Sequence, residues 1–435
     1  MRALIVTSEA PPTVSGISRT VGRLAEGLRA RGHVVDTVSS TEIPRIVFGE
    51  VRLSSFALHW PGIRRKMQGY DVVNLHGPVP TLSDVFLLMT RFSRPSSRVP
   101  LVYTHHSAIE IEGMLKATDV YNGVHRWLSH VADRTVTTSR FYRDSLFAPS
   151  ARNVSVIPWG VDPVPGIVQR SPREPGQPLR VLFVGQMRPY KGVDVLLDAV
   201  IGRAELQLTL VGAGPDLEKH ERTVRSRGAQ NVRFLGRVPD AELHLAYQEH
   251  DVIVLPSVTR AEAFGLVVLE GMVRGLVPVV SELPGVRDVA EGAGVVVPPR
   301  DADALRRALV DLAADPHEIA RLHSRSLERA AELSWESTID AYEKVMLELA
   351  PRESEHRVVD VRDGGSGYVV PRQTPRGSGD VQGANAGLPP TTRRVRLGPG
   401  PWATPRRGVR GTTPALPQNT AVDTAVDTAV DTASS

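Results

Sequence analysis

The chain has 435 residues with a formal net charge of +4, from 52 Lys and Arg against 48 Asp and Glu, which does not indicate a nucleic-acid-binding protein. Apolar residues make up 41% and charged residues 23%, an ordinary balance for a globular protein, and no apolar run reaches the roughly 18 residues of a membrane-spanning helix. The chain has no cysteine, which excludes disulfides, thiolate metal sites and a cysteine nucleophile and favours a cytoplasmic location.

The first part of the chain alternates between strand, loop and helix patterns. Continuous apolar runs predict buried strands, and apolar residues three or four positions apart predict a helix that ends near Gly32. The predicted strands are residues 2–6, 34–38, 72–75 and 100–104, and the helix carries Val21, Leu24, Ala25 and Leu28.

The same order of patterns returns at residue 180. A strand, a loop, a helix and a second strand follow one another again, so the chain predicts two Rossmann-like domains. The predicted strands are residues 180–184, 206–211, 232–235, 252–255, 277–280 and 295–297, and the predicted helices begin at Val193 and cover 303–314, 316–333 and 335–349.

These patterns predict an α/β protein with Rossmann-like domains at residues 1–162 and 179–332. Five prolines within residues 163–178 predict a hinge between them. An amphipathic helix in residues 333–350 is expected to pack back on the first domain. Residues 351–435 are rich in Pro, Gly, Arg and Thr and end in three Thr-Ala-Val-Asp repeats, which predicts a disordered tail.

The segment Glu262-Ala-Phe-Gly-Leu-Val-Val-Leu-Glu270 has two carboxylates eight positions apart. Glu262 is expected in the loop at the carboxyl end of a strand, where open α/β sheets bind ligands. Gly265 and Leu266 are predicted to open a helix, whose first N–H groups favour an anion. An anion cradle between two carboxylates suits a sugar nucleotide, whereas a surface acid followed by an acid near a helix start is the alternative.

A second group of charged residues precedes another predicted helix. Arg188 and Lys191 stand just before the helix opened by Gly192, where two cations join N–H groups that favour an anion. By contrast, Asp301 and Asp303 are interpreted as helix-capping residues rather than as a metal motif. The run Gly212-Ala-Gly-Pro215 lacks the third glycine of a dinucleotide fingerprint, so a strand-to-helix turn is expected there.

The order of motifs along the chain resembles the retaining glycosyltransferases of family 4, which share the two-domain GT-B fold. The resemblance covers about residues 1–350 and leaves the tail unexplained. The segments that carry it are Gly16, Arg31-Gly-His-Val-Val35, Thr104-His-His-Ser107, Val136-Thr-Thr-Ser139, Val156-Ile-Pro-Trp-Gly-Val-Asp162, Val184-Gly-Gln-Met-Arg-Pro-Tyr-Lys-Gly192, Val211-Gly-Ala-Gly-Pro215, Phe234-Leu-Gly-Arg-Val238 and Glu262–Glu270.

The resemblance implies two Rossmann-like domains that face each other across a cleft. It implies transfer of a sugar from a nucleotide diphosphate donor to an acceptor hydroxyl, with retention of the anomeric configuration and with no cofactor or obligatory metal. The donor is expected in the 179–332 domain and the acceptor in the 1–162 domain. The sequence does not reveal the base, the sugar or the acceptor.

The resemblance also assigns roles to individual residues. Lys191 is expected to bind the diphosphate, Glu262 the donor-sugar hydroxyls and Glu270 the ribose, while His106 matches a histidine at the cleft. The predicted catalytic residues are Glu262, Lys191 and His106, and the predicted donor-binding residues are Gly16, Arg188, Lys191, Val238, Glu262, Phe264, Gly265, Leu266 and Glu270.

Three histidines and one glutamine bear on these predicted roles. His105 and His106 are neighbours on a strand and should point to opposite faces, which argues against a shared metal ion. His76 is placed like His106 at the end of a strand, and a purely structural role is the alternative for it. The family usually has arginine where this chain has Gln186, so either Arg188 compensates or donor binding is weaker.

Other functions and partners stay open at this point. A sugar-nucleotide epimerase or phosphorylase of the same fold, or a catalytically silent nucleotide-sugar-binding protein, are the alternatives. A lipid-linked acceptor would favour peripheral membrane contact, through Trp60–Lys66 or through Arg91, Arg94 and Arg98, although solvated faces explain both clusters too. Glu262 and Lys191 are treated as exposed, so alanine at either position is expected to abolish transfer and to lower the melting temperature by a few degrees at most.

Overall fold

The computed structural model describes residues 1–11, 13, 15–39, 45–48, 51–93, 98–109, 115–146, 153–164 and 176–350. Most of the predicted hinge (165–175) and all of the predicted tail (351–435) lie outside these residues. The same holds for Arg94 in the predicted basic cluster. The fold below therefore concerns the described part of residues 1–350.

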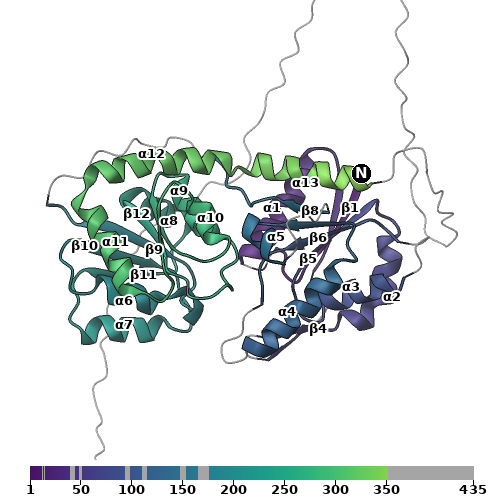
Figure 1. Cartoon of the computed structure of the whole chain (residues 1–435), viewed down its shortest axis with the longest axis horizontal. Coiled ribbons are helices and arrows are strands. Elements are labelled where there is room, and N and C mark those ends of the chain that lie inside the picture. The colour runs from purple at the N-terminus through teal and green to yellow at the C-terminus, as the bar shows by residue number, and fades with distance from the viewer. Residues whose placement is uncertain are drawn as a thin grey trace, which may run out of the picture. The chain divides into compact units, whose positions relative to one another are not determined.

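Six parallel strands form the first sheet, in the order β2-β1-β5-β6-β7-β8 (Figure 1). A short antiparallel hairpin, β3–β4, follows the second strand. The strands are β1 Arg2–Val6, β2 Val34–Val38, β3 Arg45–Phe48, β4 Val51–Ser54, β5 Val72–Gly77, β6 Leu101–His105, β7 Arg134–Thr137 and β8 Val154–Val156. The helices between them are α1 Gly16–Ala30, α2 Phe56–Met67, α3 Ser83–Arg91, α4 Leu115–Ser129 and α5 Arg140–Leu146.

The apolar runs of the sequence become the inner strands of this sheet. Every residue of β5 and β6 is buried, as expected of parallel strands that helices cover on both faces. Helix α1 starts where the Ser15 side chain accepts a hydrogen bond from the Ser18 backbone N–H, at 3.1 Å. Its apolar stripe, which includes Val21, Leu24 and Leu28, is fully buried as predicted.

A second sheet of six parallel strands follows, in the order β11-β10-β9-β12-β13-β14. Two parallel α/β sheets confirm the predicted fold class, and the predicted strand positions agree with the structure to within one or two residues. The strands are β9 Leu179–Val184, β10 Leu206–Val211, β11 Val232–Gly236, β12 Val252–Leu255, β13 Val277–Ser281 and β14 Val295–Val297. The helices are η2 Pro189–Lys191, α6 Val193–Val200, α7 Leu217–Ser226, α8 Asp240–Glu249, α9 Leu266–Met272, α10 Val286–Ala290, α11 Ala302–Ala314, α12 Pro316–Glu332 and α13 Trp335–Leu349.

The last two helices follow one another across the molecule, with α12 beside the second sheet and α13 beside the first (Figure 1). Helix α13 packs on α1 so closely that a Cβ at Gly27 would overlap the side chain of Ile339. At the turn between the helices, the Val161 N–H donates to the Leu333 carbonyl at 2.9 Å. The C-terminal helix is thus part of the structure around the first sheet.

The order of strands decides where ligands can bind. In both sheets the strands run parallel, so their carboxyl ends meet at one edge of each sheet. In the second sheet the loops after β11, β10, β9, β12 and β13 follow one another along this edge. The described helices include none that is long and apolar enough to cross a membrane.

Candidate active site

An ion pair between Lys191 and Glu262 joins two neighbouring loops at this edge of the second sheet. Lys191 ends the short helix η2 after β9, and Glu262 lies in the loop after β12. The hydroxyl of Ser257 donates to the same carboxylate oxygen of Glu262 at 3.2 Å. Two of the three predicted catalytic residues therefore touch each other.

Close packing of the two loops brings this pair together. Gly192 has a left-handed backbone with φ of 66°, and a Cβ there would overlap the carbonyl of Pro256. The Val258 N–H also donates to the Tyr190 carbonyl at 2.8 Å. Glycine at position 192 therefore allows the β9 loop to lie directly against the β12 loop.

The electrostatics of the pair keep a cation in the site. Burial, the largest single effect, would lower the pKa of Lys191, but the charge and hydrogen bond of Glu262, together with the nearby Tyr190, raise the pKa overall. Lys191 is therefore protonated at neutral pH. Its ammonium group also lies 5.3 Å from the ring centroid of Tyr190.

The two side chains are less exposed than we expected from the sequence. Only 12% of the Lys191 side chain and 11% of the Glu262 side chain are accessible. Each charge is mostly removed from water and depends on the other for compensation. The premise that both side chains are exposed is therefore wrong, and single alanine substitutions are now expected to cost stability.

Glu270, the second carboxylate of the motif, lies on α9 and makes two side-chain contacts. One carboxylate oxygen pairs with Arg19 of α1, and the other accepts a hydrogen bond from the Tyr247 hydroxyl at 3.0 Å. Burial, and then the charge of Glu270, raise the pKa of Tyr247, so this hydroxyl remains a donor. Glu270 thus connects the motif to the first helix of the chain.

The residues between the two carboxylates begin α9 as predicted. Gly265 has a left-handed backbone with φ of 83°, and Leu266 is the first helical residue. Phe264 is buried, with 4% exposure. On the opposite side, a Cβ at Gly16 would come within 3.8 Å of a Leu266 methyl group, which is an ordinary contact. Gly16 therefore lies across from the motif, but the described neighbours would not exclude a small side chain there.

Arg188 and Val238, both predicted to bind the donor, follow β9 and β11, the two strands that flank β10 in the second sheet. The Arg188 guanidinium donates from Nε to the Gln186 side chain at 2.9 Å, so the arginine does reach back to the atypical glutamine. Val238 lies two residues beyond β11 and packs against the core. The two lie on either side of the β10 loop, in accordance with the strand order.

Two motifs that we interpreted as structural do have structural roles. The Asp301 carboxylate accepts from the Ala304 N–H at 2.8 Å and caps α11. Gly212 follows β10, where a Cβ would overlap the carbonyl of Gly185. This turn therefore lies against the β9 loop.

His106, the third predicted catalytic residue, belongs to a buried aromatic cluster at the end of β6. It shares a hydrogen bond of 2.9 Å with His76 and stacks on Trp159 at 5.6 Å between ring centroids. Burial lowers the pKa of His106 to about 4, and burial together with the charge of His106 lowers that of His76. Both imidazoles are neutral at pH 7, and one donates to the other.

The neighbouring His105 has other partners, as the strand alternation predicts. It shares a hydrogen bond of 3.3 Å with the Tyr103 hydroxyl, which in turn bonds His125 at 2.7 Å. Burial lowers the pKa to about 3 for His105 and to about 4 for His125. This second group lies toward α4 rather than toward His106.

The structure adds residues that sequence reasoning missed. Arg19, Tyr247 and Ser257 bond the two motif carboxylates, and Trp159 stacks on both His76 and His106. Arg19 lies three residues after Gly16, which was predicted to bind the donor, and this proximity was the one signal in the sequence that could have pointed to it. The other three are ordinary polar or aromatic positions until the fold brings them to the site.

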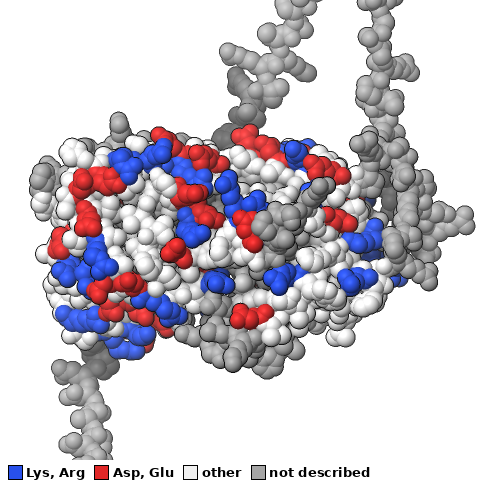
Figure 2. Space-filling model, viewed as in Figure 1, with Lys and Arg blue, Asp and Glu red and all other residues white. Residues whose placement is uncertain are grey.

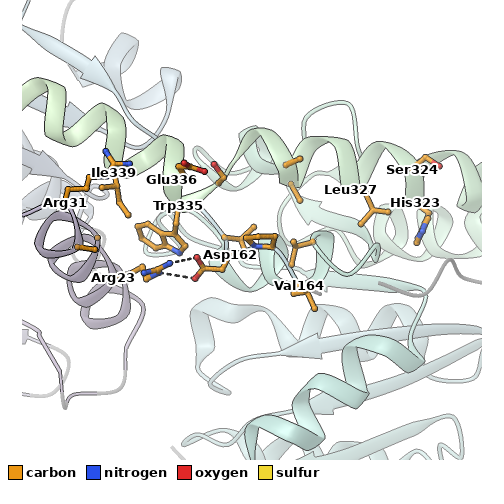
Figure 3. A pocket seen from close by; sticks show the side chains of 18 residues that line it. Arg23, Arg31, Asp162, Val164, His323, Ser324, Leu327, Trp335, Glu336 and Ile339 are labelled. Carbon is orange, nitrogen blue, oxygen red and sulfur yellow. Dashed lines mark hydrogen bonds and ion pairs between the residues drawn. The ribbon is translucent and has the colours of Figure 1, made fainter. Parts of the chain in front are cut away.

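Two cavities lie near the junction of the helices but are distinct from the Lys191–Glu262 pair. One of about 980 Å³ is bounded by α1, α12 and α13, with Trp335 and Ile339 on its wall and the Arg23–Asp162 ion pair beside them (Figure 3). The other has about 1010 Å³ and is lined by Ser139, Arg140 and Phe141 after β7, by Arg287 and Asp288 on α10, and by Phe264 of the motif. Among the described lining residues, Phe264 is the one member of the predicted site.

Comparison with known proteins is consistent with this geometry. The family model described as "Glycosyltransferase Family 4" matches residues 14–164, and that described as "Glycosyl transferases group 1" matches residues 167–331. The chain is 32% identical to the D-rhamnosyltransferase WbpZ of Pseudomonas aeruginosa, over 68% of this chain and 82% of that protein. It is also 32% identical to the phosphatidyl-myo-inositol mannosyltransferase of Mycobacterium leprae, over 68% of this chain and 83% of the relative.

A solved structure shows the same fold. HepE of Anabaena, in complex with UDP-glucose, superposes with a TM-score of 0.61 at 17% identity, over 80% of this chain and all of that one. The two parallel sheets, the matched family models and these relatives together show a glycosyltransferase of the GT-B fold. The chain belongs to the family 4 glycosyltransferases.

Proposed function

We propose that this glycosyltransferase moves a sugar from a nucleoside diphosphate donor to an acceptor hydroxyl, with retention of configuration and without an obligatory metal ion. The contact between Lys191 and Glu262 is the observation that carries the proposal. It places a cation and a hydrogen-bond acceptor side by side at the edge where parallel sheets bind ligands. The complex of HepE with UDP-glucose supports a nucleotide-sugar donor for the shared fold.

The leaving group explains the need for Lys191. Transfer leaves negative charge on the β-phosphate, and a fixed ammonium group stabilises this charge as it develops. Lys191 would supply the positive charge that a metal ion supplies in other sites. Glu262 would accept hydrogen bonds from donor-sugar hydroxyls, and the departing phosphate would take the proton of the acceptor hydroxyl.

The remaining residues would position the donor along the sheet edge. In this proposal, backbone groups near Val238 hold the base, Glu270 binds the ribose, and Arg188 with the N–H groups of Gly265 and Leu266 contacts the diphosphate. Ribose binding requires that Glu270 share its carboxylate with Arg19 or release it. Neutral His106 would orient a donor or acceptor hydroxyl near Trp159.

A panel of nucleotide sugars tests the donor. With EDTA present, one UDP-, GDP- or similar sugar is expected to raise the melting temperature, because a ligand that binds only the folded state stabilises it. The same donor should release its nucleotide faster when an acceptor mixture is added. Thermal shift followed by nucleotide detection measures both effects.

The other outcomes distinguish the alternatives. Conversion of the donor to another sugar nucleotide without acceptor would indicate an epimerase. Stabilisation without turnover under any acceptor would indicate a silent binding protein. Activity that is lost in EDTA and restored by Mg²⁺ would contradict metal independence, whereas activity unchanged in EDTA supports it.

The cavity beside Phe264 is the place we propose for the acceptor. It lies after β13 in the strand order, next to the β12 loop with Glu262, so an acceptor there would approach the donor sugar from the end opposite the base. Arginines and carboxylates line it in equal number. The guanidinium carbon of Arg287 lies 5.7 Å from the ring centroid of Phe141. Such a lining suits hydroxyl-rich groups, as in a glycan or an inositol headgroup.

Replacing Phe141 by alanine tests this placement. The acceptor KM is expected to rise about tenfold, because an aromatic face that packs on the acceptor is lost. Donor affinity should not change, since Phe141 lies on the first sheet's side of the cavity, after β7. Steady-state kinetics with varied acceptor and a donor titration measure the two constants. A change in donor affinity alone would contradict the assignment.

A further inference from the structure

Helices α3 and α4 expose a set of large apolar side chains that the transferase site does not use. On α4, Val120, Val124 and Trp127 are 68%, 52% and 52% exposed, and their spacing places them along one stripe of the helix. On α3, Leu88 is 39% exposed, and Phe92, at its C-terminal cap, is 78% exposed. We name these five residues the α3–α4 face.

The two stripes belong to one surface. Helices α3 and α4 pack against each other, and the guanidinium of Arg91 lies 4.6 Å from the ring centroid of Trp127. The opposite sides of both helices are buried, with Phe86 and Leu87 of α3 and Leu128 of α4 in the core of the first sheet. The exposed side chains are thus not a displaced part of the core. They form an outer apolar surface on helices whose inner surfaces are already packed.

Positive charge surrounds this surface. The described side chains of α2, α3 and α4 include exposed Arg65 and Arg126, and Arg91 is exposed beside Trp127. Arg64 and Lys66 add two more cations in the last turn of α2, which packs on α3. The described carboxylates of these helices are Asp119 and the largely buried Asp84, whose pKa burial raises. In the view of Figure 2, the region of α3 and α4 is largely uncharged, with isolated charged residues of both signs.

The structure also excludes part of the surface that the sequence suggested for membrane contact. Trp60 is buried, with 6% exposure, and packs edge-on against Phe86 at 5.4 Å between ring centroids. Arg98 is bound to Asp133 at 3.1 Å. The aromatic part of the predicted Trp60–Lys66 patch is therefore core, whereas Trp127 and Phe92 provide exposed aromatic rings on the neighbouring helices.

We propose that the α3–α4 face docks on the surface of an anionic lipid bilayer. Tryptophan and phenylalanine insert at the headgroup level, aliphatic side chains lie below them, and arginines beside them bind lipid phosphates. The positive charge of α2–α4 matches an anionic surface and opposes a basic partner. This contact is independent of the proposed sugar transfer, and it would bring the enzyme to acceptors held in a membrane.

Vesicle flotation with the full chain tests the proposal. The wild type is expected to float with vesicles of phosphatidylcholine and phosphatidylglycerol and to remain unbound with phosphatidylcholine alone. Substitution of both Phe92→Ser and Trp127→Ser should weaken the partition coefficient at least about tenfold, since two large apolar groups no longer insert. Arg126→Gln should weaken it about fivefold through one lost charge near the surface.

Matched variants on other helices control for general effects. Leu245 of α8 is 52% exposed, like Trp127, and Leu245→Ser should leave flotation unchanged. Arg222 of α7 has a 66% exposed side chain, and Arg222→Gln should change flotation by less than Arg126→Gln does. Unfolding midpoints of all variants establish that each one is folded.

Three results would overturn the proposal. Equal flotation of wild type and the Phe92/Trp127 variant would assign binding to another part of the chain, such as the arginines of residues 393–410. Binding that does not depend on lipid charge would exclude an anionic surface as the partner. A wild-type dimer that the same variant converts to a monomer, without a change in flotation, would make the face a contact between two copies.

Discussion

Lys191→Met is expected to lower kcat/KM for sugar transfer by about a thousandfold, as when a preorganised charge-stabilising group is removed from an active site. The ammonium is the cation in contact with Glu262, and we propose that it faces the leaving phosphate. Methionine keeps much of the side-chain volume but has no charge, so packing should be little altered. Nucleotide release with saturating acceptor measures the rate. Activity within tenfold of the wild type would contradict the assignment.

The same substitution should also cost stability. Lys191→Met leaves the Glu262 carboxylate mostly buried without its cation, and breaking a buried pair in this way costs about 3 kcal/mol of unfolding free energy. The double variant Lys191→Met/Glu262→Gln should recover most of this loss, because no unpaired charge remains, yet it should stay inactive. Urea denaturation of wild type, single and double variants measures the energies. If the double variant were as unstable as the sum of both single variants, the two residues would not act as a pair.

Much of the fold could be predicted from the sequence because its signals are local. The strand 2–6 and the helix that carries Val21, Leu24 and Leu28 appear in the structure where their patterns place them. The position of the site residues at one edge of the sheet was also predictable, since the loops that follow parallel strands all lie at the same edge. Together with the resemblance to family 4, this position allowed Lys191 and Glu262, 71 positions apart, to be assigned to one site.

What the sequence did not reveal depends on contacts between distant parts of the chain. The burial of Lys191 and Glu262 follows from the packing of the β9 and β12 loops, which Gly192 permits. Trp60 reads as an exposed aromatic beside basic residues, but the fold turns it toward Phe86. The pairing of Glu270 with Arg19 joins residues 251 positions apart, and no local pattern encodes it.

The buried histidines of the first sheet should make the protein sensitive to acid. Burial lowers the pKa from the usual 6.5 to about 3 for His105 and to about 4 for His106 and His125. Between pH 6.5 and 4 the unfolded chain therefore binds protons that the folded state does not. The stability that these histidines provide is complete above pH 6.5 and is lost as the pH falls, by about 2 kcal/mol for each of them at pH 5.

One substitution isolates the contribution of a single histidine. His125→Gln removes a titrating group but keeps a polar partner for the Tyr103 hydroxyl, and His125 has no proposed role in the reaction. The loss of unfolding free energy between pH 7.5 and pH 5 should therefore be about 2 kcal/mol smaller in this variant than in the wild type. Urea denaturation at both pH values measures it, and His317→Gln on the exposed side of α12 is the control. An equal loss in both variants would show that His125 does not stay neutral in the folded state, and acid sensitivity would then arise elsewhere.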